Sequence, residues 1–76
     1  MKDQILDAVI KHAKGQIAIH KTNVDVYLNN PAGIGEHSDV VEAVIAETEK
    51  IAHYDDVIEM VTKYWPVDSA SEAEVG

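Results

Sequence analysis

A single apolar pattern runs through the first 27 residues of the chain without a break in phase. Apolar or weakly polar side chains recur at alternating steps of four and three residues, the heptad spacing of helices that pack along a seam. These positions are Leu6, Ile10, Ala13, Ile17, His20, Val24 and Tyr27. Four more residues, Ile5, Val9, Ile19 and Val26, widen the apolar stripe beyond a bare coiled-coil seam. The pattern therefore predicts one long helix with a broad apolar face.

The segment after this pattern is the one strong chain breaker in the first 65 residues. It reads Asn29-Asn30-Pro31-Ala32-Gly33-Ile34-Gly35. The proline disfavours the α conformation for the residue before it, and two glycines follow. No strand precedes these glycines and no lysine stands directly after them, so they indicate a connector and not a phosphate-binding loop. We expect a first helix over residues 3–29 and a loop over residues 30–38, in which Ile34 folds back on the helix ends.

A second run of steps of three and four residues begins after the breaker. It passes through Val41, Val44, Thr48, Ile51, Tyr54, Ile58, Val61 and Trp65. The run predicts a second helix over residues 39–64. The remaining residues, 67–76, are small and acidic, a composition typical of a disordered tail.

Residues suited to capping mark the expected helix ends. Asp3 and Ser38 carry side-chain oxygens that can accept hydrogen bonds from the first backbone amides, so they are the expected N-caps. Asn29 or Asn30 is the expected stop of the first helix. Pro66 cannot continue the second helix.

Residues 16–28 allow a competing interpretation, because their apolar side chains also alternate. Two short strands around Lys21-Thr22-Asn23 would give an α-β-β-α chain, and Gly15 would suit the junction. We favour the helix, because the heptad spacing continues through the segment and Lys-Thr-Asn is a poor hairpin turn. In that case Gly15 costs the helix about 1 kcal/mol relative to alanine. Its place near Ala13 and Ala18 suggests a close approach of two helices.

These elements predict an all-α fold, an antiparallel two-helix hairpin over residues 1–66. Such a hairpin has one seam and no enclosed core, and a chain of 76 residues usually needs a staple or a partner. The sequence contains no cysteine for a disulfide. We therefore expect a homo-oligomer, most simply a homodimer in which two hairpins form a four-helix bundle.

The charge is concentrated in the second half of the chain. The formal net charge is −8, of which residues 1–30 carry +1 and residues 31–76 carry −9, and the chain has no arginine. An acidic surface repels phosphate, so we expect no direct nucleic-acid binding. The expected partner surface combines outward acids with the aromatic pair at the end of the second helix. It comprises Glu42, Glu49, Asp56, Glu59, Tyr64 and Trp65.

The four histidines show no metal-binding pattern. They are separated by 8, 17 and 16 residues, whereas metal sites commonly include a short-range pair of ligands. In a hairpin that turns near residue 33, positions whose numbers sum to about 67 lie level with each other. This register sets Glu47 beside His20 and Asp55 beside His12, as polar pairs that can fix the alignment of the helices. No residue pattern supports catalysis, a cofactor or a metal centre.

The sequence predicts neither a membrane-spanning segment nor a signal peptide. No stretch approaches the roughly 18 apolar residues that a membrane span requires, and the N-terminus lacks the apolar core of a signal peptide. We expect a protein of the cytoplasm or of a virion that is not secreted.

Several longer strings resemble a known group of proteins. Lys11-His12-Ala13, His20-Lys21, Asn23-Val24 and Asn30-Pro31-Ala32-Gly33-Ile34-Gly35-Glu36-His37 resemble small uncharacterised proteins of T4-like phages that infect marine cyanobacteria. The stretch from Ile51 to Met60 is similar to them too. The resemblance covers about residues 5–65. It implies a phage origin, with a role in the host cytoplasm or the virion, and it implies no activity and no functional residue.

Together these observations favour a non-enzymatic protein that acts through self-association and contact with a host or virion protein. A second hypothesis is an acidic mimic of nucleic acid that occupies the basic groove of a host protein, in which case salt would weaken the binding. A third and weaker hypothesis is a metal-binding bundle of histidines and carboxylates, which added zinc or iron would stabilise.

Overall fold

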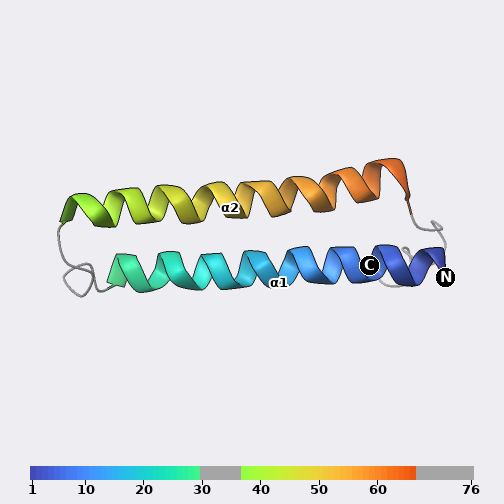
Figure 1. The fold of residues 1–76 in the computed structure, drawn as a ribbon, viewed down its shortest axis with the longest axis horizontal. Coiled ribbons are helices and arrows are strands. Elements are labelled where there is room, and N and C mark those ends of the chain that lie inside the picture. The colour runs from blue at the N-terminus through green and yellow to red at the C-terminus, as the bar shows by residue number, and fades with distance from the viewer. Residues whose placement is uncertain (30–36, 67–76) are drawn as a thin grey trace.

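The fold consists of two antiparallel α-helices that lie side by side (Figure 1). The computed structural model describes residues 1–29 and 37–66. Helix α1 spans Lys2–Asn29 and helix α2 spans His37–Tyr64, with 28 residues each. At 1.5 Å per residue each helix is about 42 Å long. The predicted all-α hairpin is confirmed. Residues 30–36 of the expected loop and the whole expected tail lie outside the described residues, whereas His37 and Ser38, which were expected in the loop, belong to α2.

Residues 16–28 are helical throughout, so the two-strand alternative is wrong. The heptad seam outweighs the strand propensity of the β-branched residues in this segment, because tertiary packing decides between marginal local preferences. Thr22 also fits the helix locally, since its hydroxyl donates a hydrogen bond to the Ala18 carbonyl at 2.8 Å. The described residues contain no strand.

The helix starts differ slightly from the predicted ones. Helix α1 begins at Lys2, so Asp3 lies in its first turn and is not the N-cap. The carbonyl of Met1 accepts the first bond instead, from the Ile5 amide at 3.1 Å. Asp3 remains favourable there because a carboxylate interacts well with the positive end of the helix dipole. Helix α2 begins at His37, so Ser38 is likewise inside the helix.

The helix ends agree with the prediction. Helix α1 ends at Asn29, whose side-chain amide donates to the Asp25 carbonyl at 2.7 Å. This side-chain hydrogen bond lies within the last turn of the helix. Helix α2 ends at Tyr64, two residues before Pro66.

The seam between the helices uses all seven positions predicted on α1, each of them buried or half-buried. On α2 the prediction needs a correction. Val41 is 61% exposed and Thr48 is exposed, so neither lies in the seam. The residues that face α1 are Val40, Val44, Glu47, Ile51, Tyr54, Ile58 and Val61. These positions keep strict steps of four and three, and the misassignment arose because Glu47 is acidic and Thr48 better matched an apolar seam.

Trp65 continues the same spacing at the open end of the hairpin. Its side chain is 52% exposed, yet it lines a small hollow with Leu6, Ile10 and Val61. It therefore covers the last layer of the seam without being enclosed by it.

Gly15 does not mark a close helix approach, contrary to the expectation. It is exposed, and a methyl group built on its Cα would meet no atom within 4 Å. The residue lies on the side of α1 that faces away from α2. The structure shows no packing reason for a glycine at this position.

Replacing Gly15 with alanine is therefore expected to stabilise the helix by about 1 kcal/mol, because alanine restricts the unfolded backbone and meets no steric contact. Thermal unfolding followed by circular dichroism should show a rise in Tm of about 4–8 °C. An unchanged or lower Tm would contradict the open environment of Gly15.

The hairpin has a thin core. Ala13 and Val61 are its buried apolar residues, and no large side chain of the described residues is fully enclosed. A long series of large apolar side chains stays exposed instead. It includes Ile5, Val9, Ile19, Val26, Leu28, Val41, Ile45, Tyr64 and Trp65. The seam between α1 and α2 thus accounts for only part of the apolar surface of the chain.

Candidate functional site

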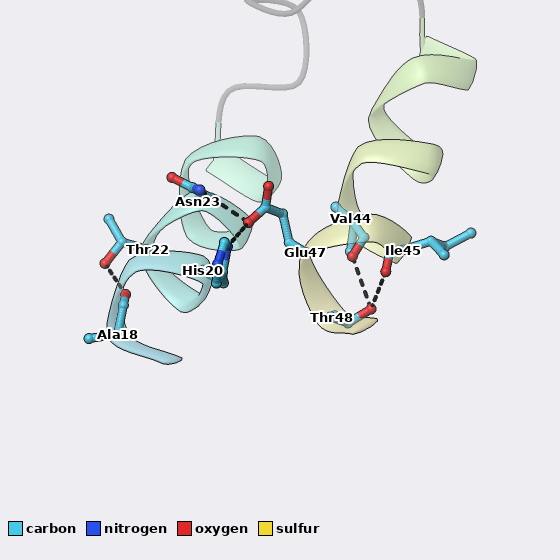
Figure 2. A network of polar contacts seen from close by, with 8 residues as sticks. All are labelled: Ala18, His20, Thr22, Asn23, Val44, Ile45, Glu47 and Thr48. Atoms are coloured by element: carbon cyan, nitrogen blue, oxygen red, sulfur yellow. Dashed lines mark hydrogen bonds and ion pairs between the residues drawn. The ribbon is translucent and has the colours of Figure 1, made fainter. Parts of the chain in front are cut away.

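A polar layer interrupts the apolar seam in the half of the hairpin nearer the connection between the helices (Figure 2). The Nδ1 atom of His20 lies 2.6 Å from Oε1 of Glu47, and both side chains are only 12% exposed. The side-chain amide of Asn23 donates to the same oxygen at 3.1 Å. The register prediction that set Glu47 beside His20 is therefore confirmed. Asn23 is a third member that the sequence reasoning missed.

Both helices contribute to this layer through the heptad spacing. His20 is a seam position of α1, Asn23 lies beside the seam one turn later, and Glu47 is a seam position of α2. If the steps of four and three are continued strictly along α2, they indicate Glu47 as a seam residue. No sequence pattern distinguishes Asn23 from other polar residues beside a seam.

The contacts of Glu47 stabilise its ionised form. The hydrogen bond from His20 is the largest cause, followed by the bond from Asn23, and together they hold the pKa of the Glu47 carboxyl below its ordinary value of 4.5. Partial burial opposes this shift, because desolvation disfavours a charge. Glu47 is therefore a carboxylate at neutral pH, held by two donors of the opposite helix.

A polar layer of this kind can select one alignment of two helices. Sliding α1 along α2 by a heptad would leave Glu47 among apolar residues without its donors, and an unpaired buried charge is costly. Buried polar residues at seam positions fix register in coiled coils in the same way. The layer aligns positions whose numbers sum to 67 or 68, such as Leu6 with Val61 and Ile17 with Ile51.

Three histidine rings surround Tyr54 next to this layer. The ring centroid of Tyr54 lies 5.8 Å from that of His12, 6.4 Å from that of His20 and 4.9 Å from that of His53. The His20 ring is stacked on Tyr54 with an interplanar angle of 8°, while the other two rings are edge-on at 75° and 83°. Aromatic contacts of these geometries are attractive.

The predicted pairing of His12 with Asp55 is wrong. No hydrogen bond or ion pair joins them within the described residues, and His12 packs against Tyr54 instead. The two residues are level along the helices but lie on opposite sides of the seam, since Asp55 follows Tyr54 by one residue, about 100° around the helix. The sum of two residue numbers predicts whether the residues lie at the same height along the helix axes. It does not predict on which side of the seam each side chain lies.

An open groove of about 580 Å³ lies over the polar layer and the tyrosine. It is lined by Gln16, His20, Ala46, Glu49, Lys50, His53 and Tyr54. These side chains offer imidazoles, an amide, a carboxylate and an ammonium group on a partly apolar floor. Among the described residues, no three His, Asp or Glu side chains converge to hold a metal ion.

The acidic side chains of the predicted partner surface lie on the outside of α2. Glu42, Glu49 and Asp56 are exposed and follow one another at intervals of seven residues, which sets them in a row along the helix. Glu59 is also exposed, on the side next to this row. These residues stay apart from the polar layer, although Glu49 borders its groove.

The aromatic pair of the predicted partner surface lies at the far end of α2. The rings of Tyr64 and Trp65 are edge-on, with centroids 6.1 Å apart, and Tyr64 is 60% exposed. The Lys63 ammonium lies 5.2 Å from the centroid of the Tyr64 ring, a cation–π contact.

Within the described residues, neither helix is apolar over a stretch long enough to cross a membrane. Comparison of the chain with protein-family models, with curated proteins and with solved structures finds no match.

Proposed function

We propose that this chain is a non-enzymatic protein that acts through self-association, with two hairpins completing a four-helix bundle, and through contact with a partner protein. The observation that carries the proposal is the thin core of the hairpin, in which Ala13 and Val61 are buried while nine large apolar side chains between Ile5 and Trp65 remain exposed.

Physical chemistry favours covering these side chains with protein. Each large aliphatic side chain moved from water into a packed interface contributes about 1.5–3 kcal/mol. A chain of this size buries too little apolar area in one seam to be firmly stable without a staple. Pairing of two hairpins supplies a second seam, and this is how four-helix bundles are assembled from helical hairpins.

The exposed acidic row supports the second part of the proposal. Glu42 and Asp56 are exposed and lie away from the seam, so they stay accessible after two hairpins have paired, and Glu49 lies between them at the edge of the groove. A regular row of carboxylates favours a partner with a basic surface. In the setting implied by the resemblance to cyanophage proteins, that partner is a host or virion protein, and the chain is an accessory or structural protein of the phage.

Self-association predicts that the thermal stability depends on protein concentration. If folding is coupled to pairing, a hundredfold increase in chain concentration should raise Tm by about 10 °C, because mass action favours the associated state. Circular dichroism melts between micromolar and hundreds of micromolar chain measure this. A Tm that does not change over this range would contradict the proposal.

A further inference from the structure

We infer that the second copy of this chain docks on one particular side of the hairpin, which we call the uncharged face. This inference rests on the proposed self-association and adds the surface that mediates it. On α1 the face is formed by Ile5, Val9, His12, Gln16, Ile19, Asn23 and Val26. On α2 it is formed by Ala43, Ala46, His53, Val57, Met60 and Tyr64, with Lys50 at its centre.

The uncharged face repeats the heptad spacing of the seam. On α1 the alternating steps of four and three run through positions 5, 9, 12, 16, 19, 23 and 26. At 100° per residue this stripe lies about 100° around the helix from the seam with α2, because each of its positions precedes a seam position by one residue. A helix in a four-helix bundle contacts two neighbours and needs two such stripes. Helix α1 therefore carries one stripe for α2 and one that α2 leaves uncovered.

Both helices present this stripe on the same side of the hairpin. Gln16 of α1 lines one groove together with Ala46, Lys50 and His53 of α2, which sets the two halves of the face next to each other. On the opposite side, Asp7 of α1 lines a separate hollow with Thr62 of α2.

The burial pattern agrees with this division of the hairpin into two sides. Next to the seam, Gln16, Asn23, Ala43 and Val57 on the uncharged face are half-buried. The corresponding positions on the opposite side are all exposed.

The charge distribution selects this side for pairing with a second copy. Among the seven positions of each helix that form the uncharged face, Lys50 is the only formally charged residue, and the exposed Glu49 borders the groove beside it. The opposite side carries Asp7, Lys11, Lys14, Lys21, Asp25, Asp55 and Glu59. For a chain with a net charge of −8, two copies meet with least repulsion and least desolvation of charge through the uncharged face.

The dimensions of the face match a stable dimer. From Ile5 to Val26 the stripe is about 32 Å long at 1.5 Å per residue, and two helices side by side are about 20 Å wide. The resulting projected area of about 640 Å² approaches the roughly 800 Å² of accessible surface that each partner buries in a standard interface. A twofold axis can pair this face with the same face of a second copy, which is the arrangement of an isologous dimer interface.

Two isoleucines that lie on opposite sides of the hairpin provide the test. Ile19 lies on the uncharged face and is 51% exposed, while Ile45 of α2 lies on the opposite side and is 50% exposed. Ile19→Lys should weaken the dimer at least a hundredfold, because the twofold axis then places two further ammonium groups among apolar side chains, in addition to the two of Lys50. Ile45→Lys has the same chemical change at the same exposure and should leave the dimer intact.

Sedimentation equilibrium of the wild-type chain and both variants measures this, with circular dichroism as the check of helix content. If I19K cannot fold alone, the milder pair I19A and I45A gives the same comparison. A dimer that withstands the change at Ile19, or that is lost on the change at Ile45, would overturn the assignment of the face while leaving self-association intact. A wild-type chain that is monomeric throughout would overturn the proposed function as well.

Discussion

Replacing Ile17 with aspartate is expected to unfold the hairpin at neutral pH. Ile17 is a half-buried seam residue whose register position on α2 is Ile51, one layer from the His20–Glu47 pair. An aspartate there places a carboxylate against apolar side chains with no donor assigned to it, and burial of an unpaired charge costs several kcal/mol. A thin core has little stability to lose. The helical circular dichroism signal at 25 °C should fall to that of an unfolded chain.

The neighbouring residue provides the control. Ala18 is exposed on the outside of α1, so Ala18→Asp adds the same charge to the same turn without entering the seam. This variant should retain its helical signal and lose at most a few degrees in Tm, as most surface substitutions do. If the Ile17 variant unfolded at the same temperature as the wild type, the assignment of Ile17 to the seam would be wrong. Equal loss in both variants would point to the added charge and not to its position.

Replacing Glu47 with glutamine is expected to lower Tm at pH 7, and the loss should disappear in acid. Because the folded-state pKa of Glu47 lies below the ordinary 4.5, its ionised form contributes stability that is fully present above about pH 4.5. This contribution is lost as the pH falls through the lowered folded-state pKa, where the carboxylate is protonated. The glutamine keeps the shape and can still accept the bond from His20, but it lacks the charge-assisted strength.

The measurement is the difference in Tm between the wild type and the glutamine variant from pH 7 down to pH 3. We expect it to be positive and constant down to about pH 4.5 and then to shrink towards zero. Glu49→Gln is the matched control, since this exposed carboxylate lies two residues away and makes no side-chain hydrogen bond or ion pair among the described residues. A difference that is the same at pH 3 and pH 7 would contradict the role of the Glu47 charge.

The helices could be predicted from the sequence because their signals reinforce one another. The four-three spacing through Ile17 and Val24, the Asn-Asn-Pro breaker and Pro66 all indicate the same boundaries, and the structure deviates by one or two residues at the starts. The deviation at the start of α1 has a local reason. The Met1 carbonyl supplies the first acceptor, and a backbone group leaves no trace in the side-chain pattern.

The polar layer was only half predictable. The register of the hairpin brought Glu47 to His20, but the apolar pattern of α2 had placed Thr48 in the seam, because an acidic residue was expected on the outside. A buried carboxylate is stable only with donors, and those donors come from the other helix, 24 and 27 residues away in the chain. The pattern within one helix cannot contain that information.

The sides of the hairpin were not predictable from residue numbers alone. His12 and Asp55 lie at the same height along the helix axes but on opposite sides of the seam. His12 packs against Tyr54 instead. Once the sides are known, the uncharged face becomes visible as a second heptad stripe. In the sequence alone, Ile5, Val9, Ile19 and Val26 indicate only a widening of the first stripe.

The central claim is that one hairpin is half of the functional unit. Sedimentation equilibrium of the wild-type chain at micromolar concentration, near neutral pH and at moderate salt, tests it most directly. The account predicts a mass of at least twice the 8.3 kDa of the chain. A species of 8.3 kDa that nevertheless unfolds in one sharp thermal transition would show that a single hairpin is stable by itself, and would contradict the account.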